Sequence, residues 1–386
     1  MTWRHGVVRS LGRSWPGAQE LQVQLLPETD RAEPATAAQE GQGQSTPTVR
    51  ALAYPDVVGQ VRPGQRVLLN TTAQTRGLGT GGYALVVALP ENLPTDPPPG
   101  PGHIVKARYT PQQVMVLGVD EQESDHHELL READDLAGMP VVVADLHSAV
   151  PAVVAGARSV AAARGRPLTV VYVMTDGGAL PAAFSRTVAG LRESGWLAAT
   201  ITTGQAYGGD VESVTVHSGL LAAHLVCAAD LVVLAQGPGN AGTGTRWGFS
   251  GVAAGEALNA AAILGGRPVA SLRVSGSDLR ERHFGISHHS LTAIGRAALA
   301  PVDVVVPELG GELGPRVRDQ ARSLGERHRL VPVPTAGLAE ALDTSPVPLS
   351  SMGRSLADDP APFLAAAAAG VHAARLVLGD QGGQPA

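Results

Sequence analysis

A glycine-rich stretch carries the clearest chemical signal in this sequence. Residues 234–251 read LAQGPGNAGTGTRWGFSG and continue an apolar run. The glycine spacing matches the G-x-G-x-x-G pattern of dinucleotide-binding loops. However, Pro238 removes a backbone donor where a pyrophosphate would need one, and Thr245 stands where a P-loop has lysine. Neither of these two phosphate-binding motifs is therefore complete.

A looser anion-binding loop is consistent with the same residues. Successive glycine amides can form a concave nest for an anion, and a helix beginning near Ser250 would add its N-terminal dipole. The expected ligand-binding residues are Gly237, Gly239, Asn240, Gly242, Thr243, Gly244 and Thr245, with Arg246 supplying positive charge. The alternative is a flexible loop that packs against a neighbouring subunit.

Polar and acidic residues follow several of the apolar runs. Asp145 follows MPVVVA, and Asp176, Gly177 and Gly178 follow VVYVMT. In an open parallel sheet, ligands bind beyond the carboxyl ends of the strands. We therefore expect Asp145 and Asp176 to act as acid–base groups, and the two glycines to contribute to the ligand-binding surface.

Histidines form a second candidate constellation. His283, His288 and His289 occur within RERHFGISHHSL, and we expect His288 or His289 to carry a proton in catalysis. Together with Asp145, His147 and Asp176, these histidines offer the nitrogen and oxygen ligands of a metal site. No zinc-finger or zincin spacing is present, so no metal ligand is assigned. A metal-dependent hydrolase therefore stays an alternative.

Two kinds of element must position these residues. Residues 1–118 contain short β-prone runs separated by glycine, proline and charged turns, which predicts a small β-barrel or sandwich. Within this part, residues 28–48 are rich in Ala, Gln, Glu and Gly, and we expect a disordered insertion.

From residue 119 the pattern changes to apolar runs that alternate with helix-like segments. MPVVVAD, PLTVVYVMTD and ADLVVLAQ are typical of strands buried on both faces. This alternation predicts a Rossmann-like parallel α/β domain over residues 119–345. Residues 346–386 are expected to form a C-terminal helix over Pro362–Leu378 and a disordered tail.

Composition excludes several classes of protein. The 386 residues carry a formal net charge of -6, with 17% charged residues and no basic stripe. We therefore expect neither a nucleic-acid nor a membrane partner. Cys227 is the single cysteine, so no disulfide can form within the chain. The C-terminal apolar run carries His372 and Arg375 and is judged too short to span a membrane. We expect a cytoplasmic protein that forms a homo-oligomer.

Several unusual strings occur in a characteristic order. They are GLGTGGY, GHIVKARYTP, MTDGGALP, HSGLLAAH, QGPGNAGTGTRWGFSG and GISHHSLTA. Together they resemble the bacterial family catalogued as domain of unknown function 3866, over nearly the whole chain. The resemblance implies no activity and assigns no residue a catalytic role.

Three functional hypotheses follow from these observations. The first is an enzyme or ligand sensor for a small anionic molecule, such as a nucleotide or phosphorylated metabolite. The second is a metal-dependent hydrolase. The third is a non-catalytic assembly protein whose glycine loops contact other subunits. The sequence identifies no cofactor.

Overall fold

The computed structural model describes residues 1–27, 46–79 and 81–379, which form two compact units. Unit 1 contains residues 1–100 and 109–114, and unit 2 contains 101–108 and everything from 115 onward. The insertion expected at 28–48 therefore falls largely outside the described residues, although Thr48 already begins a strand. The expected disordered tail also lies outside them, except for Gly379.

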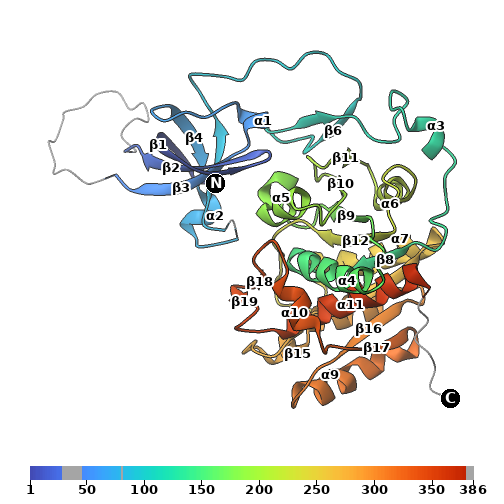
Figure 1. The fold of residues 1–386 in the computed structure, drawn as a ribbon. Helices are drawn as coiled ribbons and strands as arrows, with labels where there is room; N and C mark the ends of the chain where they lie inside the picture. Colours follow the sequence, from blue (N-terminus) through green and yellow to red (C-terminus); the bar gives the residue numbers. More distant parts are fainter. Residues whose placement is uncertain (28–45, 80, 380–386) are drawn as a thin grey trace, which may run out of the picture. The chain divides into compact units, whose positions relative to one another are not determined.

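Unit 1 is a closed five-stranded barrel with the order β1-β2-β3-β5-β4 (Figure 1). Its strands are β1 (Trp3–Trp15), β2 (Ala18–Leu25), β3 (Thr48–Ala53), β4 (Arg66–Asn70) and β5 (Ala84–Ala88), with the short helices α1 (Pro55–Val58) and α2 (Thr72–Thr75). Alternating residues such as Leu21, Val23, Val67 and Leu69 point inward and fill the barrel. Of the two β architectures expected from the sequence, the barrel is the one observed.

Unit 2 contains an eight-stranded, entirely parallel sheet with the order β11-β10-β9-β12-β8-β13-β16-β17. These strands are β8 (Pro140–Val143), β9 (Val170–Thr175), β10 (Ala199–Thr202), β11 (Val211–Glu212), β12 (Leu231–Gln236), β13 (Arg267–Ser271), β16 (Asp303–Glu308) and β17 (Arg329–Pro334). The central strands are Val-rich and fully buried because helices cover both faces. The expected Rossmann-like domain is confirmed.

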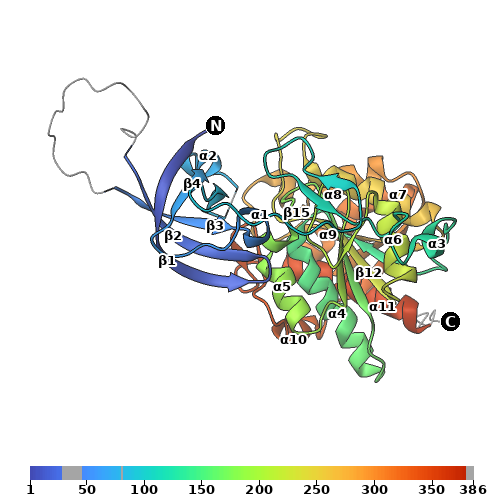
Figure 2. The same cartoon turned by 90° about the horizontal axis from the view of Figure 1, so that it is seen from above.

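Helices cover the two faces of this sheet in two separate layers (Figure 2). One layer contains α4 (Val150–Ala163), α5 (Arg186–Glu193), α10 (Leu338–Asp343) and α11 (Ala361–Leu378). The other contains α6 (Val216–Leu225), α7 (Ala253–Ile263), α8 (His288–Thr292), the π-helix Ala293–Ala297 and α9 (Leu313–Ala321), with α3 (His127–Leu130) packed on α6. Each layer has its own hydrophobic core.

Short elements complete the chain. The two-stranded pairs are β6 (Ile104–Lys106) with β7 (Val114–Val116), β14 (Val274–Ser275) with β15 (Gly285–Ile286), and β18 (Ser350–Ser351) with β19 (Arg354–Ser355). The 3₁₀ helices are His147–Ala149, Ala182–Phe184, Ser250–Val252, Glu281–His283 and Arg322–Glu326. Several of these short elements lie beyond the carboxyl ends of the parallel strands.

The long C-terminal helix α11 packs on α4 with almost no space between the two backbones (Figure 1). A Cβ atom on Gly370 would lie 1.9 Å from the Val153 carbonyl oxygen, and one on Gly156 would lie 2.0 Å from that of Ala367. Glycine is therefore required at both crossing points.

The apolar character of α11 follows from its burial. The helix has 18 residues and is long and apolar enough to cross a membrane by length and composition, so the expectation that this run is too short is wrong. However, 67% of it is buried inside the protein. Burial between α4 and the sheet explains why its sequence is so rich in alanine.

The chain leaves neighbouring strands toward opposite faces near the middle of the sheet. β8 and β12 are neighbours, but the chain leaves β8 toward α4 on one face and leaves β12 toward α7 on the other. Such a divergence at the carboxyl ends of parallel strands is where open α/β sheets bind ligands.

Candidate ligand pocket at the carboxyl edge of the sheet

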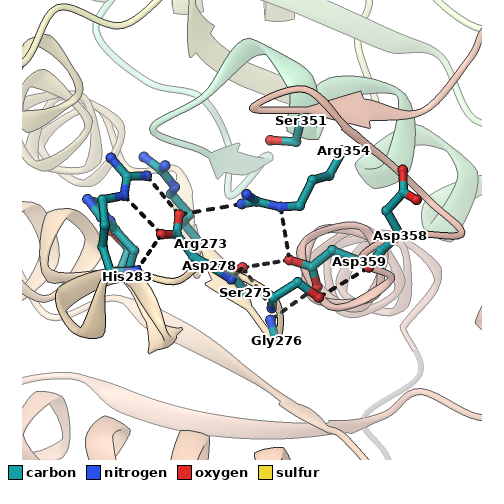
Figure 3. A network of polar contacts seen from close by, with 12 residues as sticks. Arg273, Ser275, Gly276, Asp278, His283, Ser351, Arg354, Asp358 and Asp359 are labelled. Atoms are coloured by element: carbon teal, nitrogen blue, oxygen red, sulfur yellow. Dashed lines mark hydrogen bonds and ion pairs between the residues drawn. The ribbon is translucent and has the colours of Figure 1, made fainter.

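A pocket of about 510 Å³, counted with its solvent-open part, lies beyond the carboxyl ends of β8 and β13. Its polar lining residues include Asp145, Arg273, Ser275, Asp278, Ser351 and Arg354, most of which appear in Figure 3. They come from the ends of two central strands, from β14 and the loop after it, and from the β18–β19 hairpin. The fold therefore gathers them at one edge of the sheet.

Arg273 is the central cation of this pocket. It stands between β13 and β14, and its side chain is only 9% exposed. One guanidinium nitrogen, Nη1, lies 3.9 Å from Oδ2 of Asp145 and 3.2 Å from Nδ1 of His289. Guanidinium groups only donate, so Nδ1 of His289 accepts this hydrogen bond. Arg273 thus connects two predicted site residues, Asp145 and His289.

Asp145 is buried directly after β8 and has an unusual environment. Its Oδ2 atom has no hydrogen-bond partner among the described residues. Burial raises the pKa of this carboxyl group, and the nearby Arg273 charge opposes part of that rise. Asp145 also lines a second, smaller hollow together with Thr175, Gln236 and Ser250. The Gln236 amide donates to the backbone carbonyl of Asp145 at 2.8 Å.

Arg354 lies between two carboxylates, as Figure 3 shows. Its Nη2 is 3.4 Å from Asp278, and its Nε is 3.6 Å from Asp359 but makes no hydrogen bond. Both carboxylates have closer partners. Arg280 binds Asp278 through two hydrogen bonds of 2.7 and 2.9 Å and holds the pKa of that carboxyl well below its usual range. Ser275 donates to Asp359 at 2.5 Å.

Three histidines gather beside this pocket. His283 lines it, and the ring centroids of His288 and His289 lie 4.9 and 5.0 Å from that of His283. Burial is the main cause that lowers their pKa values, to about 4 for His283 and about 3 for His289, and the positive charge of Arg273 adds to it. The pKa of His288 is lowered by the same two causes, together with Arg282. All three rings are therefore neutral at pH 7.

The other predicted acid, Asp176, lies outside both pockets. Its side chain is exposed after β9, and its Oδ2 accepts a hydrogen bond from the backbone of Gln205 at 2.9 Å. The two glycines that follow it allow close packing. A Cβ on Gly177 would lie 2.3 Å from the Gln236 side chain, and one on Gly178 would lie 2.6 Å from the Gly237 carbonyl oxygen. Packing alone thus accounts for glycine at these positions.

The glycine-rich loop forms most of its hydrogen bonds with itself. The Thr243 amide donates to the Gly248 carbonyl at 2.7 Å, and the Thr245 hydroxyl accepts from the Gly248 amide at 3.1 Å. The hydroxyls of Thr243 and Thr245 are also 3.1 Å apart. Asn240 closes the base of the loop by accepting from the Ser250 hydroxyl at 2.8 Å. These threonine hydroxyls are therefore already engaged.

The remaining loop residues have backbone contacts or conformations that do not involve a ligand. Gly237 donates to the Thr175 carbonyl, Gly242 forms a bridge with Phe249, and Gly239 takes a positive φ of 100°. Arg246 is exposed, whereas Arg282 donates to the Gly244 carbonyl at 2.8 Å. None of the residues from Gly237 to Arg246 lines either of the two pockets.

His147, which the metal hypothesis included, is buried and lines neither of the two pockets. Its Nδ1 lies 3.0 Å from the Tyr172 hydroxyl, and its Nε2 lies 2.7 Å from the Ser185 hydroxyl. Burial lowers its pKa to about 4. Both ring nitrogens are engaged in this network, so His147 has no nitrogen available for a metal.

Arg273 and Arg354 are not among the site residues predicted from the sequence. Arg273 interrupts the apolar run VASLRVS, and a lone charge at a strand end is the one signal that could have indicated it. Arg354 lies in the segment SSMGRSL, which has no recognisable motif, and it reaches the pocket only through the tertiary fold.

Comparison with known proteins identifies the family. The chain matches the family described as "Protein of unknown function (DUF3866)" over residues 50–370. The match covers most of the chain, so the protein belongs to this family, as the sequence motifs indicated. No curated protein and no solved structure matches the chain.

Proposed function

We propose that this member of the DUF3866 family binds a small anionic molecule in the pocket at the carboxyl ends of β8 and β13. The proposal rests on the environment of Arg273, which is buried but has no carboxylate within hydrogen-bond distance. Its guanidinium is almost fully buried, yet the nearest carboxylate oxygen is 3.9 Å away, too far for a hydrogen bond. A buried cation without a bonded anion is costly, and a bound anion would remove that cost.

The second arginine of the pocket supports the same proposal. Arg354 has a buried Nε donor without a hydrogen-bond partner among the described residues. Its two carboxylate neighbours are more closely bound by Arg280 and Ser275. Guanidinium groups match the planar oxygen pairs of carboxylate and phosphate. Two such groups in one pocket favour a ligand with either of these anions.

Asp145 narrows the class of ligand further. Its Oδ2 is a buried acceptor without a donor, and it lines the same pocket as the two arginines. A hydroxyl or amino group next to the anionic group of the ligand would satisfy this oxygen. Nucleotides and sugar phosphates carry both features. Because its pKa is raised, Asp145 is also the carboxyl group in the pocket best suited to exchange a proton with a ligand.

A thermal-unfolding screen tests this proposal. Protein treated with a chelator is heated with inorganic phosphate, nucleotides, sugar phosphates or hydroxy acids at matched ionic strength. A ligand that binds the folded state raises the melting temperature in proportion to ln(1 + [L]/Kd). Arg273→Met should weaken the affinity about tenfold or more, since a hydrogen bond to a charged group contributes ~1.5–3 kcal/mol.

Two further variants make the screen specific. Arg354→Met removes the second guanidinium and should also weaken binding. Arg322→Met is the matched control, because the Arg322 side chain is 80% exposed and lies away from the pocket. If Arg273→Met and Arg354→Met both keep the wild-type affinity, the ligand binds elsewhere and this pocket is not the site.

A further inference from the structure

The histidine cluster has a geometry that the anion proposal does not use. His283 ends a 3₁₀ turn, and His288 and His289 open helix α8 after the capping residue Ser287. One nitrogen from each ring can be chosen so that all three atoms lie within 4.8 Å of one another. Among the described residues, no other group of three histidine, cysteine or acidic side chains meets this condition.

Neighbouring residues hold two of these rings in place. The Ser287 hydroxyl lies 2.8 Å from Nδ1 of His283, which leaves Nε2 of that ring for another partner. The His289 ring stacks on Phe249, with centroids 3.9 Å apart and planes 1° from parallel. His288 has a buried Nε2 without any hydrogen bond. An unsatisfied buried nitrogen beside two oriented imidazoles is unusual in a packed protein interior.

We propose that His283, His288 and His289 bind a divalent transition-metal ion such as Zn²⁺ or Co²⁺. Three histidines with a fourth position left for water or substrate are the ligand set of one class of catalytic zinc site. His283 also lines the pocket of Arg273, so the open position would face the proposed anion site. The metal proposal itself does not depend on the anion proposal.

The hydrogen bond from Arg273 to His289 must break before His289 can ligate a metal. While Nδ1 of His289 accepts from Arg273, Nε2 must carry the ring proton and cannot ligate a metal. If the metal binds Nδ1, Arg273 is displaced directly. If it binds Nε2, the proton moves to Nδ1, which then no longer accepts. In either case the metal and this hydrogen bond exclude each other.

Metal loading therefore releases Arg273 from His289. The freed guanidinium stays in the pocket, where it can bind an anion that also approaches the metal. The positively charged guanidinium of Arg273 also lies only 3.2 Å from Nδ1 of His289. The metal-free protein thus holds a competing donor and a competing charge at this site. Removal of Arg273 should strengthen metal binding, whereas it should weaken anion binding.

Cobalt titration of the full-length chain tests the site. We expect one Co²⁺ ion per chain, with the visible absorption bands of a four- or five-coordinate ion, and displacement by Zn²⁺. His288→Gln and His289→Gln should each lower the Co²⁺ affinity at least tenfold. His217→Gln, which changes an exposed histidine on α6, should leave the affinity unchanged. Arg273→Met should bind Co²⁺ more tightly than the wild type.

The outcomes separate this proposal from the anion proposal. The metal site is ruled out if the wild type binds neither Co²⁺ nor Zn²⁺, if both histidine variants keep the wild-type affinity, or if Arg273→Met binds Co²⁺ more weakly. Melting curves of the metal-free variants identify any substitution that prevents folding. If the histidine variants do not fold, the Co²⁺ affinity of Arg273→Met decides whether the metal site is accepted. The anion screen uses chelator-treated protein, so its failure leaves the metal titration unaffected.

Discussion

The carboxylate of Asp145 stands 3.9 Å from the guanidinium of Arg273, and both side chains are buried. At this distance the two groups attract each other without a hydrogen bond. Burial raises the pKa of Asp145 despite the attraction, which indicates that the cost of burying the charge exceeds the gain from the pair. The pair therefore contributes little stability and leaves both groups available to a ligand.

Asp145→Asn should stabilise the protein at neutral pH. The folded-state pKa of Asp145 is raised, so the wild type loses stability as the pH rises through that pKa. The amide variant avoids this loss, so we expect its free energy of unfolding at pH 7 to be higher than that of the wild type. Urea unfolding at pH 7 and at pH 3.5 measures it, and the difference should vanish at the lower pH. A less stable variant at pH 7 would mean that attraction to Arg273 outweighs burial.

Gly370→Ala should destabilise the contact between α11 and α4. The new Cβ would lie 1.9 Å from the Val153 carbonyl oxygen, so the helices must move apart. Alanine gains about 1 kcal/mol of helix propensity, but we expect a net loss of about 2 kcal/mol or more because a backbone atom cannot yield. Denaturant unfolding measures the change. Gly310→Ala is the control, since nothing lies within 4 Å of its Cβ position.

Lys106→Met should be strongly destabilising. Lys106 is the only lysine in the chain, and its side chain is 1% exposed. Its Nζ donates to two carbonyls of unit 2 and to Glu212, which is 2.7 Å away. Removing one partner of a buried pair costs ~3–5 kcal/mol. The double variant Lys106→Met/Glu212→Gln should recover part of this loss, and no recovery would show that the carbonyl contacts dominate.

The amine of Lys106 can also be used to measure how often the protein unfolds around it. An amine-reactive reagent should leave Lys106 unmodified in the folded protein and modify it on unfolding. Mass spectrometry of the peptide that contains Lys106 measures the fraction modified. Glu212→Gln should increase the labelling rate, because it removes the ion pair that holds Nζ. Rapid labelling of the wild type under native conditions would contradict the buried position.

His147 should make the protein less stable in mild acid. Its pKa falls from about 6.5 to about 4 on folding, so the unfolded state binds a proton that the folded state does not between these pH values. Stability is therefore lost as the pH falls from 6.5 to 4, by roughly 3 kcal/mol from this residue. Unfolding free energies at several pH values measure the slope.

His147→Gln should reduce that slope without abolishing it. His283 and His289 also have lowered pKa values, so they too reduce the stability of the folded protein as the pH falls. His217→Gln changes an exposed ring and should keep the wild-type slope. If His147→Gln shows the full wild-type slope, then His147 does not titrate in this range.

The sequence predicts the architecture well because burial on both faces leaves a simple pattern. Val141, Val142 and Val143 are all buried, as are Val171 and Val173, and such uninterrupted apolar runs are typical of central parallel strands. The strand-end rule then indicates where Asp145 lies. These inferences need only local sequence and one topological rule.

Glycine is a more ambiguous signal. Gly177, Gly178 and Gly237 could each approach a ligand or another backbone, and the sequence does not distinguish the two uses. In the structure a Cβ on any of them would meet protein atoms within 2.6 Å. The partners of Arg273 and Arg354 could not be predicted either, because they come from distant segments. Only the folded sheet brings Asp145, Asp278 and His289 to these arginines.

The residues that line the pocket come from widely separated parts of the chain. One wall comes from the end of β8 near residue 145, whereas Ser351, Arg354 and Phe363 close the opposite side. A nascent chain on the ribosome can therefore pair its first strands long before the cavity exists. Loss of the final few dozen residues, by a premature stop or by proteolysis, would spare all eight strands of the sheet but remove Arg354 together with α11, which covers one face of that sheet.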